Sequence, residues 1–316
     1  MTPELAIATY GLTKRFEGHI AVNDVDLQVN AGEVYGLIGP NGAGKTTLIQ
    51  MLATAEEPTK GEIYLHGDRL LRDDSNSSLK QRIGYLPDDF PLYNDLTVYD
   101  YLEYFARLYR LKPPYRQRRI YEVLELVQLE NKSKSIISTL SRGMKQRLSL
   151  ARTIIHEPIL LLLDEPVSGL DPLARQQFRQ IIRVLQEAGM TILISSHVLS
   201  DLAELCTSIG IMELGFLVES ASLTKLYQKL SRQQITIGTL GKMEILQQKL
   251  RQNSLVETWE MMPQNNHLKV NFTGGEAEGA ELLRSLILAD IPLTEFHCSQ
   301  EDLESIFLKL GHQQTS

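Results

Sequence analysis

A glycine-rich loop constrains the fold of this chain more than any other feature. The loop and the residue after it are Gly39, Pro40, Asn41, Gly42, Ala43, Gly44, Lys45, Thr46 and Thr47. It lies between a strand-like segment, 33–39, and a helix-like segment that begins TTLIQMLA. Glycines let backbone N–H groups surround phosphate oxygens, and the helix N-terminus adds partial positive charge. With a lysine for the β- and γ-phosphates and a threonine hydroxyl for Mg²⁺, the pattern predicts a nucleotide site.

Two adjacent carboxylates, Asp164 and Glu165, end a second apolar run, ILLLL at 159–163. Ligands of open α/β folds bind at the carboxyl edge of the sheet, so we expect these side chains beside the phosphates. Asp164 is the candidate for holding Mg²⁺, and Glu165 is the candidate for orienting or deprotonating the attacking water. Acidic residues also occur at strand ends simply because they reach solvent there, so the pair alone does not indicate catalysis. The phosphate loop in the same chain favours a role of the two carboxylates in catalysis.

Strand-like and helix-like segments alternate over residues 1–220, which predicts an α/β domain with a mainly parallel sheet covered by helices. A third strand is expected at 191–196 (TILISS). Between the strand-like segments 33–39 and 159–163, apolar residues recur at three- and four-residue spacing in VYDYLEYFARLYRL and YEVLELVQL. We therefore expect a helical subdomain at about 87–155.

Residues 221–316 form a separate α+β pattern. The order of expected elements is strand, helix, strand, strand, helix, strand and a final helix from about Glu301, which is the ferredoxin-like order. The first six are expected at 235–237, 242–252, 256–262, 267–272, 276–290 and 293–299. We find no catalytic constellation there, since His267, His297 and Cys298 lack the paired spacing of metal ligands. A regulatory or dimer-stabilising role is the natural expectation.

Composition argues against several classes of protein. The formal net charge is −7, the opposite of the basic footprint of a nucleic-acid-binding chain. Only two cysteines occur, Cys206 and Cys298, which makes a disulfide framework improbable and fits a reducing cytoplasm. The longest apolar run, 159–163, is far shorter than the ~18 residues of a membrane span, and no signal peptide is visible.

A third motif, LSRGMKQR at 140–147, precedes a helix, with Ser141 placed as its N-cap. The set of motifs resembles the nucleotide-binding subunit of an ATP-binding cassette (ABC) transporter over roughly residues 4–220. In that resemblance LSRGM is the signature LSGGQ, 23 residues before Asp164. Ser168–Asp171 (SGLD) is the D-loop, and His197, 32 residues after Glu165, is the switch histidine.

The resemblance implies an ATP hydrolase with the P-loop ABC ATPase fold that closes head to tail with a second copy or a related subunit. Each ATP then lies between one phosphate loop and the partner's Ser141 and Gly143. Phe16, 23 residues before Gly39, matches the aromatic that stacks on adenine, with a core position as the alternative. The resemblance also implies a separate transmembrane permease subunit, and a peripheral place on the cytoplasmic face of the membrane.

Two positions depart from the family pattern. Asp88 stands where members usually carry Gln; a carboxylate can bind Mg²⁺ but adds negative charge near the γ-phosphate. In the signature, Arg142 replaces a Gly and Met144 replaces Gln. We expect Arg142 to add a positive charge near phosphate. Both departures, and the ending SQEDLESIFLKLG, are similar to exporter ATPases whose membrane subunits are separate chains.

Two alternatives remain at this point. The first is an ABC ATPase that acts on nucleic acid or ribosomes without a membrane partner. Such proteins commonly carry two cassettes, a long coiled coil or zinc-binding insertions, and the acidic balance and single cassette favour no nucleic-acid partner. The second is a module that closes on ATP without hydrolysing it. Asp88 alone supports that alternative, and the presence of Glu165 and His197 argues against it.

Overall fold

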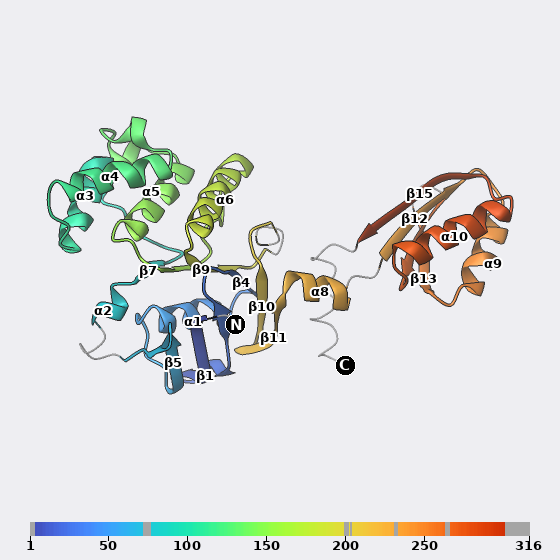
Figure 1. Ribbon diagram of the computed structural model, residues 1–316, viewed down its shortest axis with the longest axis horizontal. Helices are drawn as coiled ribbons and strands as arrows, with labels where there is room; N and C mark the ends of the chain where they lie inside the picture. The colour runs from blue at the N-terminus through green and yellow to red at the C-terminus, as the bar shows by residue number, and fades with distance from the viewer. Residues whose placement is uncertain are drawn as a thin grey trace. The chain divides into compact units, whose positions relative to one another are not determined.

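The computed structural model describes residues 4–71, 77–198, 202, 204–230, 233–262 and 266–300. The chain forms two compact units, Met1–Leu223 and Thr224–Ser316, which Figure 1 draws from blue to red along the chain. We expected the first domain to end at residue 220. Strand β11 (Phe216–Ser222) extends past that point because it pairs antiparallel with β10 (Ser208–Glu213) up to Ser222.

A six-stranded sheet forms the centre of the first unit, in the order β11-β10-β4-β9-β8-β7. All neighbours run parallel except β11. The three strands that the sequence predicted are β4 (Val34–Ile38), β8 (Leu160–Leu163) and β9 (Thr191–Ser196), and β7 is Ile83–Leu86. Residues of β4, β8 and β9 are buried throughout, as continuous apolar strands covered on both faces should be.

Two helices cover this sheet and follow directly from site loops. Helix α1 (Lys45–Leu52) follows the phosphate loop and contributes Leu48 and Ile49 to the core. Helix α6 (Pro172–Glu187) begins at the N-cap Asp171, whose side chain accepts a hydrogen bond from the backbone N–H of Ala174 at 2.9 Å. Its buried face includes Phe178, Ile182 and Leu185.

A second, antiparallel sheet was not anticipated from the sequence. It runs in the order β2-β1-β5-β6, with β3 also paired to β1. Its strands are Leu5–Phe16, His19–Val25, Gln28–Asn30, Lys60–Leu65 and Asp68–Arg69, numbered β1, β2, β3, β5 and β6. The only continuous apolar run in β1 is the four residues 5–8, and buried and half-exposed residues mix along the rest of the strand. The sheet matters for function because the β1–β2 turn lies beside the phosphate loop.

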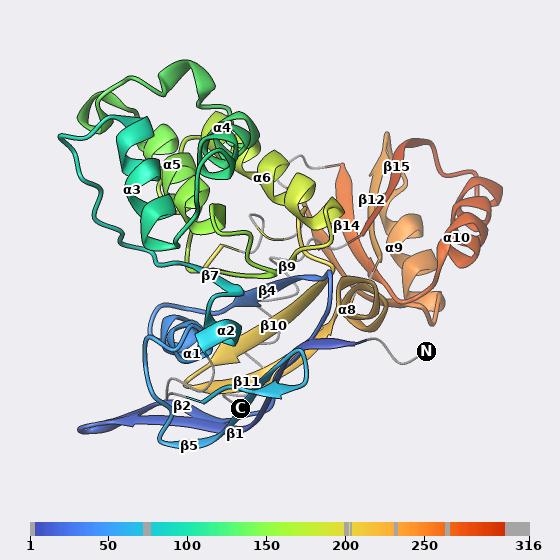
Figure 2. The same cartoon turned by 60° about the vertical axis from the view of Figure 1, so that its left-hand side comes forward.

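The helical subdomain expected at about 87–155 is present as α3 (Val98–Leu108), α4 (Tyr115–Leu126) and α5 (Arg142–Ile154), drawn in green in Figures 1 and 2. A four-residue helix, α2 (Ser77–Lys80), lies before β7. Arg152 on α5 stacks over the rings of Phe90 and Phe105, at 3.7 and 5.0 Å from their centroids. Within the described ranges, no helix is long and apolar enough to cross a membrane.

The second unit has the ferredoxin-like order that the sequence predicted. Its elements are β12 (Gln233–Thr239), α9 (Met243–Gln252), β13 (Val256–Met261), β14 (His267–Phe272), α10 (Glu276–Leu288) and β15 (Leu293–Gln300). The sheet order is β13-β14-β12-β15, antiparallel throughout. Helix α8 (Leu223–Leu230) was not anticipated. The helix expected from Glu301 lies outside the described residues.

Leu185→Ala should lower the free energy of unfolding of the first unit by about 2–5 kcal/mol, because a buried leucine is lost and a cavity remains. Leu173, on the same helix, is 63% exposed against 5% for Leu185. Leu173→Ala is therefore the control, with an expected change below about 0.5 kcal/mol. Urea unfolding followed by far-UV circular dichroism measures both. The single tryptophan, Trp259, lies in the second unit, so its fluorescence midpoint should stay unchanged. Equal losses in both variants would contradict the buried face of α6.

Candidate functional site

The phosphate loop spans the short gap between the end of β4 and the start of α1. Gly42 and Gly44 have φ of 82° and 102°, in the region that favours glycine. A Cβ at Gly44 would collide with the carbonyl oxygen of Ala21, and one at Gly39 with the carbonyl oxygen of Met212. The loop therefore requires glycine both for its backbone angles and for its close approach to neighbouring strands.

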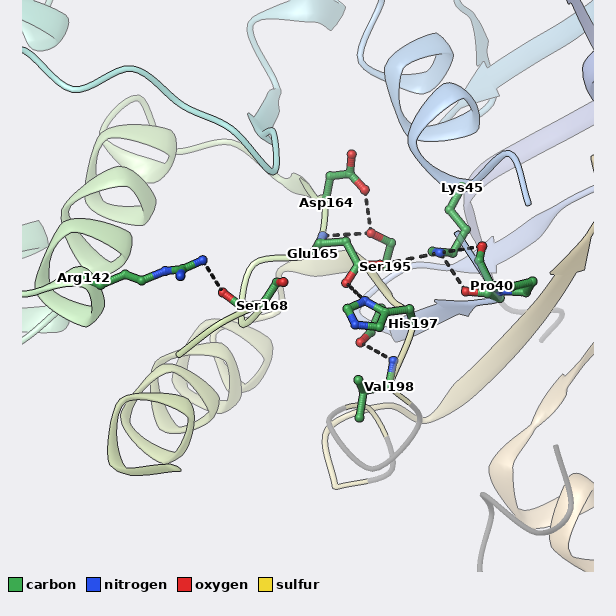
Figure 3. A network of polar contacts seen from close by, with 11 residues as sticks. Pro40, Lys45, Arg142, Asp164, Glu165, Ser168, Ser195, His197 and Val198 are labelled. Carbon is green, nitrogen blue, oxygen red and sulfur yellow. Dashed lines mark hydrogen bonds and ion pairs between the residues drawn. The ribbon is translucent and has the colours of Figure 1, made fainter. Parts of the chain in front are cut away.

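Lys45 is 5% exposed, and its ammonium group is held within the loop. Nζ donates to the carbonyl oxygens of Gly39 at 2.7 Å and Pro40 at 3.3 Å. It also forms an ion pair with Glu165, with Nζ and Oε1 separated by 3.5 Å, as Figure 3 shows. The phosphate loop and the carboxylate pair, 120 residues apart in the sequence, thus meet at one edge of the sheet.

Glu165 is held on its other side by His197. The Nδ1 atom of His197 lies 2.8 Å from Oε2 of Glu165, so the carboxylate joins Lys45 and His197. Glu165 has φ of 47°, an uncommon value for a residue with a side chain, which turns the chain sharply at the strand end. Its backbone N–H donates to Oγ of Ser195 at 2.9 Å.

Asp164 is 1% exposed and lies one residue before this turn. Its Oδ1 accepts a hydrogen bond from Oγ of Ser195 at 2.7 Å, while its Oδ2 is buried with no hydrogen-bond partner. Burial raises the pKa of Asp164, and the nearby charges of Asp88 and Glu165 raise it further. Hydrogen bonds from Ser195 and Thr46 oppose that shift. The negative charge of the Asp164 carboxylate is therefore not balanced by a nearby positive charge among the described residues.

A cavity beside the phosphate loop brings several of the predicted residues together. Its lining comprises His19, Ile20, Ala21, Asn41, Gly42, Ala43, Gly44, Lys45, Thr46, Thr47, Asp88 and Glu165. Asp88, which stands in the slot that usually holds glutamine, thus faces the same space as Lys45 and Glu165. Phe16 does not line the cavity, and it is half-buried instead of forming part of the core. It stacks on His19, with ring centroids 5.6 Å apart and planes 27° apart.

The signature residues lie away from this cavity. Ser141 caps α5, and its Oγ accepts a hydrogen bond from the backbone N–H of Met144 at 3.3 Å. Gly143 is buried against Ala174 of α6, where an added Cβ would lie 2.7 Å from the alanine Cβ. Neither residue lines the cavity of its own chain. The exposed N-terminus of α5 leaves the Ser141 hydroxyl available to a ligand from outside the chain.

Comparison with known proteins agrees with this geometry. The family described as "ABC transporter" matches residues 22–168. An uncharacterised ABC transporter ATP-binding protein, YcbN of Bacillus subtilis, is 33% identical over 96% of both chains. The chain belongs to the ABC transporter family. The bacitracin transport ATP-binding protein BcrA of Enterococcus faecalis is 33% identical, over 98% of this chain and 97% of that protein. A solved dimeric bacterial ABC transporter cassette is 26% identical, with a TM-score of 0.62 over 69% of this chain and 98% of the cassette.

This ABC transporter subunit has the P-loop cassette fold and is an ATP-binding and ATP-hydrolysing protein, as the sequence predicted. ABC ATP-binding subunits dimerise and work with membrane subunits. Two residues of its site were missed by the sequence analysis, Ser195 and His19. Ser195 lies on β9, two residues before His197, so strand alternation was an available signal. His19 follows Phe16 across a tight turn, and no sequence motif marks it.

The oxygen atoms near the phosphate loop form a donor set that fits a hard divalent cation. They come from the hydroxyl of Thr46 and the carboxylates of Asp164 and Asp88. Mg²⁺ prefers such oxygen ligands. The buried, unpartnered Oδ2 of Asp164 is the observation that fits a missing positive charge best.

Asp164→Asn should raise the melting temperature of the nucleotide-free ABC subunit at pH 7. The pKa of Asp164 is higher in the folded chain than in the unfolded chain, so its ionised form destabilises the fold. Asparagine keeps an oxygen for Ser195 but carries no charge. The gain should vanish below about pH 4, where the aspartate is protonated even in the unfolded chain. We expect the melting temperature to rise by a few degrees, since a stabilisation of 1 kcal/mol raises the melting temperature of a domain of this size by about 2–4 °C.

Scanning calorimetry between pH 3 and pH 8 checks this, with Asp89→Asn as the control. Asp89 is exposed and does not line the cavity, so its replacement should leave the melting temperature unchanged. A gain of equal size in both variants, or a gain that persists at low pH, would contradict the role of burial at Asp164.

Proposed function

We propose that this chain powers an exporter by hydrolysing ATP at the edge of its parallel sheet. The observation that carries the proposal is the arrangement of Lys45 and His197 on either side of the Glu165 carboxylate, with Asp164 as the preceding residue. A cation for phosphate, a base, a group that orients the base and an oxygen ligand for a metal are the parts that phosphoryl transfer to water requires.

In the proposed site the backbone N–H groups of residues 41–47 and the ammonium group of Lys45 bind the phosphates. Phe16, with His19 stacked on it, forms the platform for adenine. Thr46, Asp164 and Asp88 hold Mg²⁺ with their oxygen atoms. When bound, Mg²⁺ neutralises charge on the β- and γ-phosphate oxygens.

Glu165 acts as the general base in this proposal. A water molecule attacks the γ-phosphorus, the bond to the bridging oxygen breaks, and the proton of the water passes to the Glu165 carboxylate. In the structure the carboxylate forms an ion pair with Lys45, with Oε1 and Nζ 3.5 Å apart. Phosphate oxygens compete for Lys45, so nucleotide binding leaves Glu165 with its hydrogen bond to His197. His197 thereby orients the base.

Two copies complete each site. Ser141 and Gly143 begin a helix whose N-terminus attracts anions, yet they lie outside the cavity of their own chain. We infer that they bind the γ-phosphate held by the phosphate loop of a second copy or a related subunit. The likeness to a solved dimeric ABC cassette supports this inference. Hydrolysis then removes the anion that joins the two surfaces.

A separate transmembrane permease subunit carries out the transport. The present chain binds that permease subunit on the cytoplasmic face of the membrane, as a peripheral protein. Export is supported by the sequence resemblance to exporter ATPases, and a role in transport is supported by the relative described as a bacitracin transport ATP-binding protein. The second unit, with its own hydrophobic core, is proposed as the regulatory or dimer-stabilising part.

Glu165→Gln should reduce ATP hydrolysis at least about 100-fold, because the amide cannot accept the proton of the attacking water. The variant should still bind ATP and elute as a dimer from gel filtration with ATP and Mg²⁺. The control is the double variant Lys45→Ala/Glu165→Gln, which should remain a monomer because it lacks the phosphate-binding cation. A variant that retains bound ATP but stays monomeric would contradict the two-copy site.

Affinity purification of tagged Glu165→Gln protein from gently solubilised cells with ATP tests the partner. We expect one protein with several membrane-spanning segments, in about stoichiometric amount, because ABC ATP-binding subunits work with membrane subunits. The Lys45→Ala/Glu165→Gln protein, treated identically, measures whether that association depends on nucleotide. Ribosomes or nucleic acid without a membrane protein would contradict the transport function.

A further inference from the structure

The side chain of Arg142, the residue that departs most from the family signature, does not point freely into solvent as an extra phosphate cation would. Arg142 is the first residue of α5, and its Nη2 donates to the carbonyl oxygen of Ser168 at 3.0 Å, as Figure 3 shows. Ser168 is the first residue of the D-loop of the same chain. The expected charge near phosphate is therefore engaged within the chain.

Gly169 makes room for this contact. A Cβ built at Gly169 would lie 2.5 Å from both terminal nitrogens of Arg142 and 2.6 Å from its Cζ. Gly169 also has φ of 65°, in the region that favours glycine, so a side chain there would strain the backbone and force the flexible guanidinium group to move. The guanidinium group thus occupies the space in which any other side chain at position 169 would begin.

The residue that Arg142 contacts, Ser168, is itself hydrogen-bonded to the proposed base, Glu165. The backbone N–H of Ser168 donates to the carbonyl oxygen of Glu165 at 3.1 Å, which closes the turn that starts at Glu165. The N–H of Glu165 is bound by Ser195 on the other side. Arg142 therefore holds one end of the turn whose other end carries the Glu165 carboxylate.

We propose that Arg142 is a positioning residue for Glu165, linking the first turn of the signature helix to the turn that carries the base. This inference rests on the proposed role of Glu165. Movement of α5 is thereby coupled to the orientation of the carboxylate in the same chain. An interaction made in this way affects the rate of the chemical step and leaves ATP binding at the chain's own phosphate loop unchanged, since neither Arg142 nor Ser168 lines that cavity.

Steady-state hydrolysis of MgATP by the full-length chain tests the proposal with Arg142→Ala and Arg142→Lys. We expect kcat to fall about tenfold or more in Arg142→Ala, the scale of one charge-assisted hydrogen bond, with KM within about twofold. Arg142→Lys should recover part of kcat, because an ammonium group can also donate to the Ser168 carbonyl. Both variants should melt at the wild-type temperature, because Arg142 is exposed.

Arg183→Ala is the matched control. Arg183 is also a helical arginine whose Nη2 donates to a loop carbonyl, that of Glu204 at 3.1 Å, but it lies on α6 away from the site. Its replacement should leave kcat and KM unchanged. An equal fall in kcat for both variants would overturn the proposal.

Gly169→Ala provides a second test. An alanine there displaces the guanidinium group, so the fall in kcat caused by Arg142→Ala should largely disappear in the Gly169→Ala background. Additive effects would overturn the proposal, as would an unchanged kcat in Arg142→Ala. A raised KM with unchanged kcat would instead assign Arg142 to nucleotide binding. If the wild-type chain does not hydrolyse ATP, the proposed function itself fails, before any Arg142 variant is compared.

Discussion

The ion pair between Lys45 and Glu165 joins the two halves of the site, and the parallel pairing of β4, β9 and β8 makes it possible. Because parallel strands end at the same edge of the sheet, the loops that follow them converge there. Ile38 pairs with Ser196, and Leu163 pairs with Ile194 on the other side of β9. The phosphate loop, the carboxylate turn and His197 each follow one of these strands. A register shift of one residue would move the groups apart by more than a hydrogen bond can span.

The charges at this edge explain why the site suits a nucleotide bound with a cation. Lys45 is the only lysine or arginine among the described residues that line the cavity, whereas Asp88 and Glu165 both line it and Asp164 lies beneath. Burial without a full set of partners leaves Asp164 with a raised pKa. A polyphosphate alone would meet this negative charge, and a divalent cation held by the same oxygen atoms removes the conflict.

The signature helix α5 is connected to the turn of Glu165 through the D-loop. Ser141 presents a capped helix N-terminus outside its own cavity, and Gly143 lets α5 approach α6 closely. Arg142 adds a direct hydrogen bond from that helix to Ser168, and Ser168 closes the turn of Glu165. The first turn of the signature helix and the turn that carries Glu165, the proposed base, are therefore linked through two hydrogen bonds.

The phosphate loop, the buried strands and the ferredoxin-like order of the second unit could be predicted from the sequence, because each depends on a local pattern: glycines before a lysine, continuous apolar runs, or alternating strands and helices. It also indicated Asp164, Glu165 and His197, whose positions after strands place them at one edge. Which atoms contact one another could not be predicted, because it depends on how distant segments pack. Ser195 bridges Asp164 and Glu165, His19 stacks on Phe16 and lines the cavity, and Arg142 binds Ser168 instead of facing outward. Most of these contacts join residues far apart in the chain, and local patterns carry no information about such distances.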